Sequence, residues 1–275
     1  MTVSTLALSI VIAAAALSLI MFGSWVAWRR TRNSGWIDAT WTFGLGATGL
    51  AGIVAPCLLS GSVMGRQILV ATLIAAWSLR LGFHIVRRTA RITDDPRYAK
   101  LAREWGAGAS LQMLVLVEKQ ALISVPLVLS IWLAGWNTAA LRVQDLFAVL
   151  VLLAAIAGEA VADAQLRRFR AAPANRDRVC DAGLWAWSRH PNYFFEWLGW
   201  IAYPLFAVDI GGAYPWGWLA VSGPLCMYWL LVHVSGIPPL EEHMLERRPD
   251  EFRAYQARTS AFFPLPPLFI GADGR

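Results

Sequence analysis

Seven long apolar stretches dominate this sequence, and each approaches the length that a helix needs to cross a lipid bilayer. They lie at about residues 4–28, 39–60, 67–86, 111–135, 144–163, 193–212 and 214–235. A crossing helix needs roughly 20 apolar residues, and unpaired backbone groups are costly in lipid, so such stretches must be helical. The sequence therefore predicts an all-α polytopic membrane bundle of about seven transmembrane helices.

The charge of the chain does not indicate a nucleic-acid-binding protein. Only 15% of the residues are charged, whereas soluble domains carry about 25%. The net charge is +6, but the basic residues lie in short loops, where they set topology and contact lipid headgroups. The first stretch lacks a basic segment before it, so we expect no cleaved signal peptide. The three cysteines have no metal-ligand spacing.

Arginine and lysine are distributed asymmetrically between the loops. The loops after the first, third and fifth spans and the tail after the seventh hold 20 of the 24 basic residues. The loops after the second and fourth spans hold one each, Arg66 and Arg142, and the loop after the sixth holds none. Because cytosolic loops are enriched in basic residues, the N-terminus is predicted outside and the C-terminus in the cytosol.

Most polar side chains in or beside the spans fall at one depth, near the predicted cytosolic ends. They are Asp38, Arg80, His84, Glu118, Lys119, Gln120, Glu159, Asp163, Asn192, Glu196 and His233. One interpretation is a shared polar cavity, because charged groups in a membrane need partners or water. The other is that each side chain extends separately to the interface. Within this single bundle we expect a three-span substrate-side part, residues 1–110, and a four-span cofactor-binding part, residues 111–275.

A charged stripe continues out of the fifth span. Its residues follow at intervals of four, four and three, which places them on one helix face: Glu159, Asp163, Arg167 and Arg170. Arginine matches phosphate oxygens, so Arg167, Arg170 and the nearby Arg178 are candidate ligands of a nucleotide phosphate. Asp163 is a candidate for ribose hydroxyls. The alternative is an intrahelical salt-bridge ladder.

The segment Gly183–Glu196 is the densest polar stretch beside a span; it reads Gly-Leu-Trp-Ala-Trp-Ser-Arg-His-Pro-Asn-Tyr-Phe-Phe-Glu. Pro191 suits the first turn of a helix, and the free N–H groups there attract an anion. Asn192 has the paired donor and acceptor that a carboxamide requires. The segment predicts a helix start that binds a nucleotide, although His190 by itself is equally an interfacial structural residue.

Adjacent carboxylates, Glu241 and Glu242, follow the last span after a pair of prolines. Such residues often only complement the dipole at a helix start, which is the alternative to a place beside a cofactor. Further on, Tyr255 begins the tail pattern Tyr-Gln-Ala-Arg-Thr-Ser-Ala-Phe-Phe-Pro and is a further candidate.

One motif is misleading. Residues 44–49, Gly-Leu-Gly-Ala-Thr-Gly, satisfy the dinucleotide fingerprint G-x-G-x-x-G. That fingerprint requires a preceding strand and a following helix start, whereas this motif lies inside the second span. We expect its glycines to allow close helix packing.

Taken together, the motifs resemble the steroid 5-alpha-reductase-like membrane enzymes. The similarity is strongest from about Glu159 to Pro264, and three shorter stretches are similar to the bacterial branch, DUF1295: Trp36-Ile37-Asp38, Trp77-Ser78-Leu79-Arg80-Leu81 and Asp95-Pro96-Arg97-Tyr98. An Arg-His-Pro-x-Tyr signature also occurs in isoprenylcysteine carboxyl methyltransferases.

The resemblance implies an NADPH-dependent oxidoreductase that acts on CH–CH bonds, like a 3-oxo-5-alpha-steroid 4-dehydrogenase, in a bacterial inner membrane. Motifs and resemblance together give this cofactor-binding set: Asp163, Arg167, Arg170, Arg178, Arg189, His190, Asn192, Tyr193, Glu196, Glu241, Glu242 and Tyr255. The expected partners are membrane lipids and a lipophilic substrate from the bilayer; neither nucleic acid nor a protein partner is expected. A sterol, an unsaturated fatty acyl lipid and a polyprenoid all remain open as substrates.

The residues expected to bind the substrate differ from the pattern of the steroid 5-alpha-reductases. Steroid 5-alpha-reductases carry a Gln-Glu pair in an early span and a catalytic tyrosine further on, which polarise the substrate carbonyl. Here the second span has no Gln-Glu, and neither the second nor the third span contains a tyrosine. The candidate catalytic groups, which would stabilise an enolate, are therefore Asp38, if burial keeps it protonated, and Arg80 with His84. Glu118 and Gln120 are candidates for the substrate pocket.

Two other classes of function compete with the reductase. A methyltransferase that uses S-adenosylmethionine is favoured by Arg189-His190-Pro191-x-Tyr193 and by the Glu241-Glu242 pair. The basic stripe favours a phosphate-bearing dinucleotide instead. The third class is a lipid-binding or scaffold protein without enzymatic activity.

Overall fold

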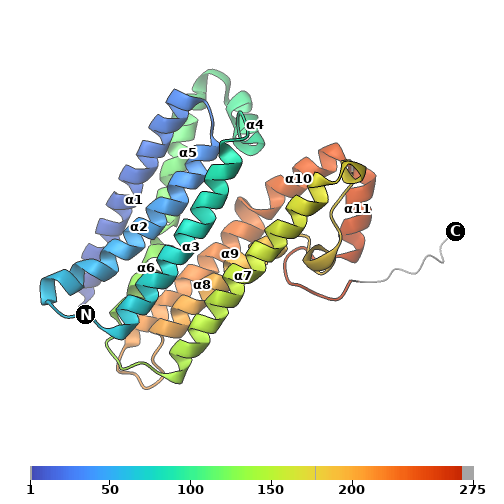
Figure 1. Ribbon diagram of the computed structural model, residues 1–275. Helices are drawn as coiled ribbons and strands as arrows, with labels where there is room; N and C mark the ends of the chain where they lie inside the picture. Colours follow the sequence, from blue (N-terminus) through green and yellow to red (C-terminus); the bar gives the residue numbers. More distant parts are fainter. Residues whose placement is uncertain (1, 177, 268–275) are drawn as a thin grey trace. The chain divides into compact units, whose positions relative to one another are not determined.

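The computed structural model describes residues 2–176 and 178–267, and within these ranges it contains helices and no strand, which confirms the all-α prediction (Figure 1). The α-helices are α1 Val3–Thr31, α2 Gly35–Ser60, α3 Gly65–Thr89, α4 Pro96–Trp105, α5 Ala109–Ile123, α6 Val125–Trp136, α7 Val143–Ala171, α8 Pro191–Ala207, α9 Ser222–Trp229, α10 Ile237–Arg247 and α11 Pro249–Arg258. Short 3₁₀ and π-helical turns join several of them.

Among the described residues, six helical segments are long and apolar enough to cross a membrane, which indicates an integral multi-pass membrane protein. They are Val3–Thr31, Gly35–Ser60, Gly65–Thr89, Pro96–Trp136, Val143–Ala171 and Pro215–Arg247. The sequence predicted one more span, the sixth in order, at about residues 193–212. The helix found there, α8, has 17 residues and ends at Ala207, so it falls short of the roughly 20 residues that a perpendicular crossing requires. The orientation of the chain stays a prediction.

The chain packs as two compact units. Unit 1 comprises Met1–Val149 with Tyr203–Cys226, and unit 2 comprises Leu150–Ala202 with Met227–Arg275, so the boundaries fall inside α7, α8 and α9. These units describe packing, whereas the division at residue 110 concerns roles in substrate and cofactor binding and stays a prediction.

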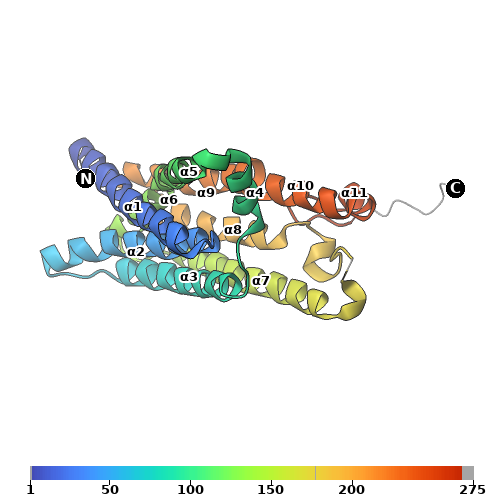
Figure 2. The ribbon, with the colours of Figure 1, turned by 90° about the horizontal axis from the view of Figure 1, so that it is seen from above.

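In unit 1, α2 packs against α1, α3 and α6, and α1 also packs against α5 and α6 (Figures 1 and 2). Glycines make these approaches possible. A Cβ atom at Gly46 would lie 2.3 Å from the hydroxyl oxygen of Ser78, and one at Gly44 would lie 2.5 Å from the side chain of Ile20 on α1. The G-x-G-x-x-G motif is thus a helix-packing surface, as the sequence predicted.

A buried ion pair fastens one end of unit 1. Arg66 at the start of α3 is 1% exposed and pairs with Asp145 at the start of α7, at 2.7 and 3.0 Å. Its other N–H groups donate to the carbonyl oxygens of Asn137, Ala139 and Ala140 at 2.6 to 3.0 Å. All five guanidinium donors are therefore satisfied, and the loop between α6 and α7 is held to α3.

In unit 2, α10 and α11 meet at a sharp bend after Arg247 (Figure 1). Phe252 and Tyr255 of α11 pack with Val179, which follows α7, in a small buried cluster. The phenol of Tyr255 donates to the carbonyl oxygen of Trp185. Tyr255 therefore anchors α11 to the segment that leads into α8.

Candidate functional site

The segment before α8 is held in place by the C-terminal tail. Gly183, with φ of 63°, begins a 3₁₀ turn that ends at Ala186. The amide of Arg189 then donates to the carbonyl of Ser260 at 2.8 Å, and the hydroxyl of Ser188 donates to that of Phe262 at 2.8 Å. Helix α8 begins at Pro191, as the sequence predicted. The polar motif and the tail thus form one site at the N-terminus of α8.

Arg189 is the structural centre of this site. Its side chain is 11% exposed and forms a forked ion pair with Glu241 of α10, at 2.8 and 3.2 Å. The remaining terminal nitrogen donates to the carbonyl oxygens of Gln256 and Thr259, at 3.3 and 2.5 Å. Because protein groups use four of its five N–H donors, Arg189 fastens α10 and α11 to the start of α8 and has little left for a phosphate.

Glu241 accepts four hydrogen bonds. Besides the two from Arg189, its carboxylate is 2.9 Å from Nε2 of His190 and accepts from the amide of Gln256 at 2.7 Å. A carboxylate has about four acceptor positions, so this one is saturated. Glu241 therefore orients its neighbours. Sequence reasoning missed Gln256, whose only signal was its place beside Tyr255 in the tail pattern.

His190 is buried, with its side chain 5% exposed. Its ring stacks on that of Tyr193, with centroids 5.4 Å apart. Burial lowers the pKa of His190 below its ordinary value and outweighs the hydrogen bond to Glu241, which acts in the opposite direction. Its Nδ1 atom is buried and has no hydrogen-bond partner among the described residues. The imidazole therefore carries an unused acceptor or donor inside the site.

The lowered pKa of His190 predicts a pH dependence of stability. The folded state resists protonating the ring, so its contribution is fully present above the ordinary pKa of 6.5 and is lost as the pH falls below that value. We expect the thermal stability of the wild type, relative to a His190→Gln variant, to decrease between about pH 7 and about pH 5. Thermal unfolding in detergent micelles measures this. A difference between the two proteins that does not vary with pH would contradict it.

The other predicted cofactor residues of unit 2 lie in different surroundings. Glu196 is buried and accepts from the indole of Trp200 at 3.0 Å. Asp163 is 8% exposed on α7. Half-buried or exposed positions are occupied by Arg167, Arg170, Arg178, Asn192, Tyr193 and Glu242. Arg167 and Arg170, in the last turns of α7, and Arg178 after it are exposed, whereas the guanidinium of Arg189 is paired with Glu241.

A second polar cluster, in unit 1, surrounds Asp38 at the start of α2. Its carboxylate accepts from Arg97 at 2.5 Å and from the phenol of Tyr98 at 2.8 Å, and Arg88 lies 3.5 Å away. The amide of Gln120 donates to the oxygen of Tyr98 at 3.0 Å. Both carboxylate oxygens of Asp38 thus accept a hydrogen bond, one from a guanidinium and one from a phenol, and its role as a catalytic group stays a prediction.

Sequence reasoning missed Tyr98 because it sought a tyrosine inside the second and third spans. Tyr98 lies on α4, where Asp95 caps the helix and Pro96 occupies its first turn.

The other predicted residues of unit 1 lie on α3 and α5. Arg80 and His84 are half-buried one turn apart on α3. Glu118 accepts from the hydroxyl of Ser18 on α1 at 2.5 Å. In unit 1, the phenol of Tyr98 therefore links Asp38 and Gln120, because it hydrogen-bonds to both.

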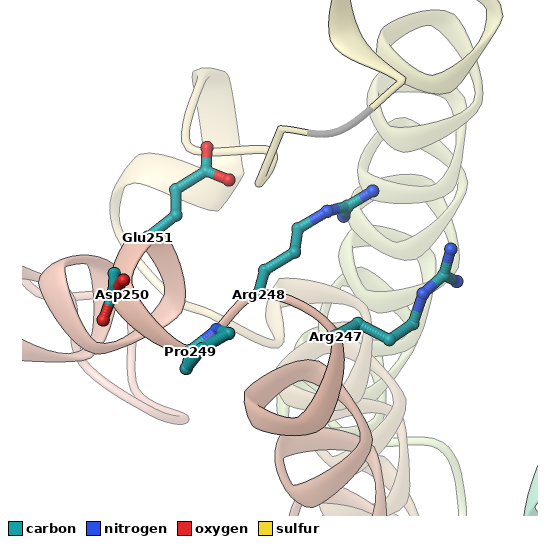
Figure 3. Close-up of a pocket in the computed structure, with 5 residues that line it drawn as sticks. All are labelled: Arg247, Arg248, Pro249, Asp250 and Glu251. Atoms are coloured by element: carbon teal, nitrogen blue, oxygen red, sulfur yellow. The ribbon is translucent and has the colours of Figure 1, made fainter.

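A pocket of about 390 Å³ lies at the bend between α10 and α11 (Figure 3). Arg247, Arg248, Pro249, Asp250 and Glu251 line it. In Figure 3 the two arginine side chains extend to the same side, away from Asp250. Arg248 donates to the carbonyl oxygens of Arg176 and Arg178, and Glu251 accepts from the amide of Val179 at 2.8 Å. None of the site residues predicted from the sequence lines this pocket.

Comparison with known proteins identifies the family of the chain. No curated protein matches the chain. A family model described as "Protein of unknown function (DUF1295)" matches residues 24–259, a range that includes every candidate site residue predicted from the sequence. The chain therefore belongs to the DUF1295 family.

Proposed function

We propose that this protein is an NADPH-dependent membrane reductase that transfers hydride to an activated C=C bond of a lipophilic substrate, in a bacterial inner membrane with its C-terminus in the cytosol. The observation that carries the proposal is the site before α8, where Arg189, Glu241 and Gln256 fix a buried His190 whose Nδ1 has no partner among the described residues. A buried polar atom without a partner costs about 1–3 kcal/mol, which a bound ligand would offset.

The residues of unit 2 are chemically suited to a phosphorylated nucleotide. The exposed arginines Arg167 and Arg170 in the last turns of α7, and Arg178 after it, suit the phosphate oxygens. Asn192 and His190, at the start of α8, suit the hydroxyl and amide groups. When bound, NADPH supplies the hydride. The exposed arginines also favour it over S-adenosylmethionine, which carries no phosphate.

In unit 1 we assign the acid to Tyr98. Hydride addition to a conjugated carbonyl leaves negative charge on the oxygen, which a positioned donor must stabilise. The phenol of Tyr98 donates its one proton to Asp38 and accepts from Gln120, so it would give that proton to a substrate oxygen only after turning away from Asp38. Asp38 then serves as a positioning residue, while Arg80 and His84 remain candidate cationic or proton-donating groups.

Ligand titration of the purified protein in lipid nanodiscs tests the cofactor. We expect NADPH to raise the free energy of unfolding by about 2.7 kcal/mol at about 100 times its Kd, by mass action. Stabilisation by S-adenosylmethionine with indifference to NADPH would instead support the methyltransferase. Indifference to both would support a lipid-binding or scaffold protein.

Replacing Tyr98 by phenylalanine tests the acid. We expect enone-dependent oxidation of NADPH to fall by about 100-fold or more, because general acid catalysis contributes that much, while the Kd of NADPH stays unchanged. Asp38→Asn should lower the rate as well, through the position of the phenol. The matched control is Tyr214→Phe, since Tyr214 is another tyrosine of unit 1 and its hydroxyl makes no hydrogen bond with the described residues. Wild-type turnover by Tyr98→Phe would remove Tyr98 from the mechanism.

A further inference from the structure

The ring of His190 is oriented by one partner and left open at its other nitrogen. Nε2 lies 2.9 Å from Oε1 of Glu241. The same oxygen accepts from Arg189, and the other carboxylate oxygen accepts from Arg189 and Gln256. A carboxylate in this arrangement acts only as an acceptor, so the hydrogen of the imidazole belongs on Nε2.

We propose that Glu241 holds His190 in the neutral Nε2–H tautomer, so that Nδ1 accepts a hydrogen bond from a hydroxyl or amino group of the bound nucleotide. This inference rests on the proposed function and specifies what the ligand must present to His190. It makes His190 a specificity-determining residue and Glu241, with Arg189 and Gln256, the group that sets its tautomer.

The other protonation states of the ring fit the contacts less well. An Nδ1–H tautomer would place the lone pair of Nε2 against a carboxylate oxygen and leave a buried N–H group unpaired. A charged imidazolium would satisfy Glu241 but would also bury an unpaired N–H group, and burial lowers the pKa of this ring. The neutral Nε2–H form leaves only an unused acceptor, which is the least costly arrangement and the one that a donor completes.

The surroundings of the ring explain why a donor to Nδ1 would come from a ligand. The imidazole cannot turn toward a group of the chain without losing Glu241 and its stacking on Tyr193. Tyr193 and Asn192 are both half-buried. Tyr193 stacks on a face of the imidazole, so its ring leaves the Nδ1 edge for a ligand seated against the start of α8.

The tautomer is tested without any ligand. In protein labelled with ¹⁵N at histidine, the ring correlation pattern assigned with a His190→Gln variant distinguishes Nε2–H from Nδ1–H. We expect the Nε2–H form, with an unprotonated Nδ1 whose ¹⁵N resonance shifts when NADPH is added. An Nδ1–H or doubly protonated ring at neutral pH would overturn the inference, whatever the cofactor proves to be.

The acceptor role is tested by binding. Glutamine places an amide nitrogen near the position of Nε2, so His190→Gln keeps a donor for Glu241 and removes the acceptor at Nδ1. We expect NADPH to bind about tenfold more weakly, the equivalent of one hydrogen bond, while thermal stability at neutral pH is retained. The matched control is His243→Gln, on α10, which should leave the Kd unchanged. An unchanged Kd for His190→Gln would overturn the acceptor role.

Two NADPH analogues separate the possible donors. One carries an acetyl group in place of the carboxamide and lacks its N–H donors; the other lacks the 2′-hydroxyl of the nicotinamide ribose. The analogue that lacks the relevant donor should bind the wild type about tenfold more weakly than NADPH does. It should bind His190→Gln about as well as NADPH binds that variant, because the two deletions remove the same contact. Additive losses for both analogues would overturn the assignment to these donors. Failure of NADPH itself to bind the wild type would remove the proposed function, while the ring spectrum still decides the tautomer.

Discussion

Replacing Arg66 by methionine is expected to lower the free energy of unfolding by about 3–5 kcal/mol, because it leaves a buried carboxylate without its partner. Arg66 and Asp145 have side chains 1% and 3% exposed. Three loop carbonyls also lose their donors. For a chain of this size the change corresponds to a decrease in melting temperature of roughly 10 °C in detergent micelles.

Two further variants identify the cause of this loss. Arg142→Met removes a half-buried arginine that lies 3.4 Å from Asp209, and it should cost no more than about 1 kcal/mol. The double variant Arg66→Met/Asp145→Leu should recover part of the loss, since the uncompensated charge is gone. If Arg66→Met unfolded at the wild-type temperature, the ion pair would have no role in holding the loop between α6 and α7.

Replacing Arg189 by methionine is expected to destabilise unit 2 by about 3–5 kcal/mol and to abolish binding at the site before α8. The substitution leaves Glu241 with only His190 and Gln256, and it removes the donors to the carbonyl oxygens of Gln256 and Thr259. The tail should then detach. Limited proteolysis after Thr259, together with thermal unfolding, measures both effects.

The matched control is Arg258→Met. Arg258 also forms an ion pair, with Asp181, but its side chain is 44% exposed. An exposed pair contributes at most about 1 kcal/mol, so both the protease pattern and the melting temperature should stay near those of the wild type. Arg189→Lys should recover only part of the loss, since lysine lacks the planar fork. Equal behaviour of the Arg189 and Arg258 variants would show that burial of the first pair is not what matters.

The fold was largely predictable because hydrophobic length and glycine spacing are local properties. Five of the seven predicted spans have counterparts among the long apolar helices from Val3 to Ala171, and the last overlaps Pro215–Arg247. The sixth span was predicted to end at about residue 212 because apolar residues continue past Pro204, whereas the helix ends at Ala207. Apolar character alone does not show where a helix stops.

The start of α8 was also predictable. Pro191 after a polar stretch marks a helix N-terminus, and the structure begins α8 there. The pairing of Arg189 with Glu241 could not be predicted, because the two residues are 52 positions apart and nothing in their local patterns links them. The same holds for Tyr98 and Asp38, 60 positions apart on different helices.

Arg66 is the clearest example of a residue whose role could not be predicted from the sequence. In the sequence it is a lone basic residue in a short loop and reads as a topology signal. In the structure it is among the most buried side chains, and all its donors are used. The amino-acid order was enough to predict an all-helical membrane protein, the glycine packing of α2 and the polar segment before α8, because each depends on the order of residues along one helix or turn. Which charges are paired, and which nitrogen of His190 has no partner among the described residues, became known from the folded chain, because ion pairing and burial depend on residues that are distant in the chain and close in space.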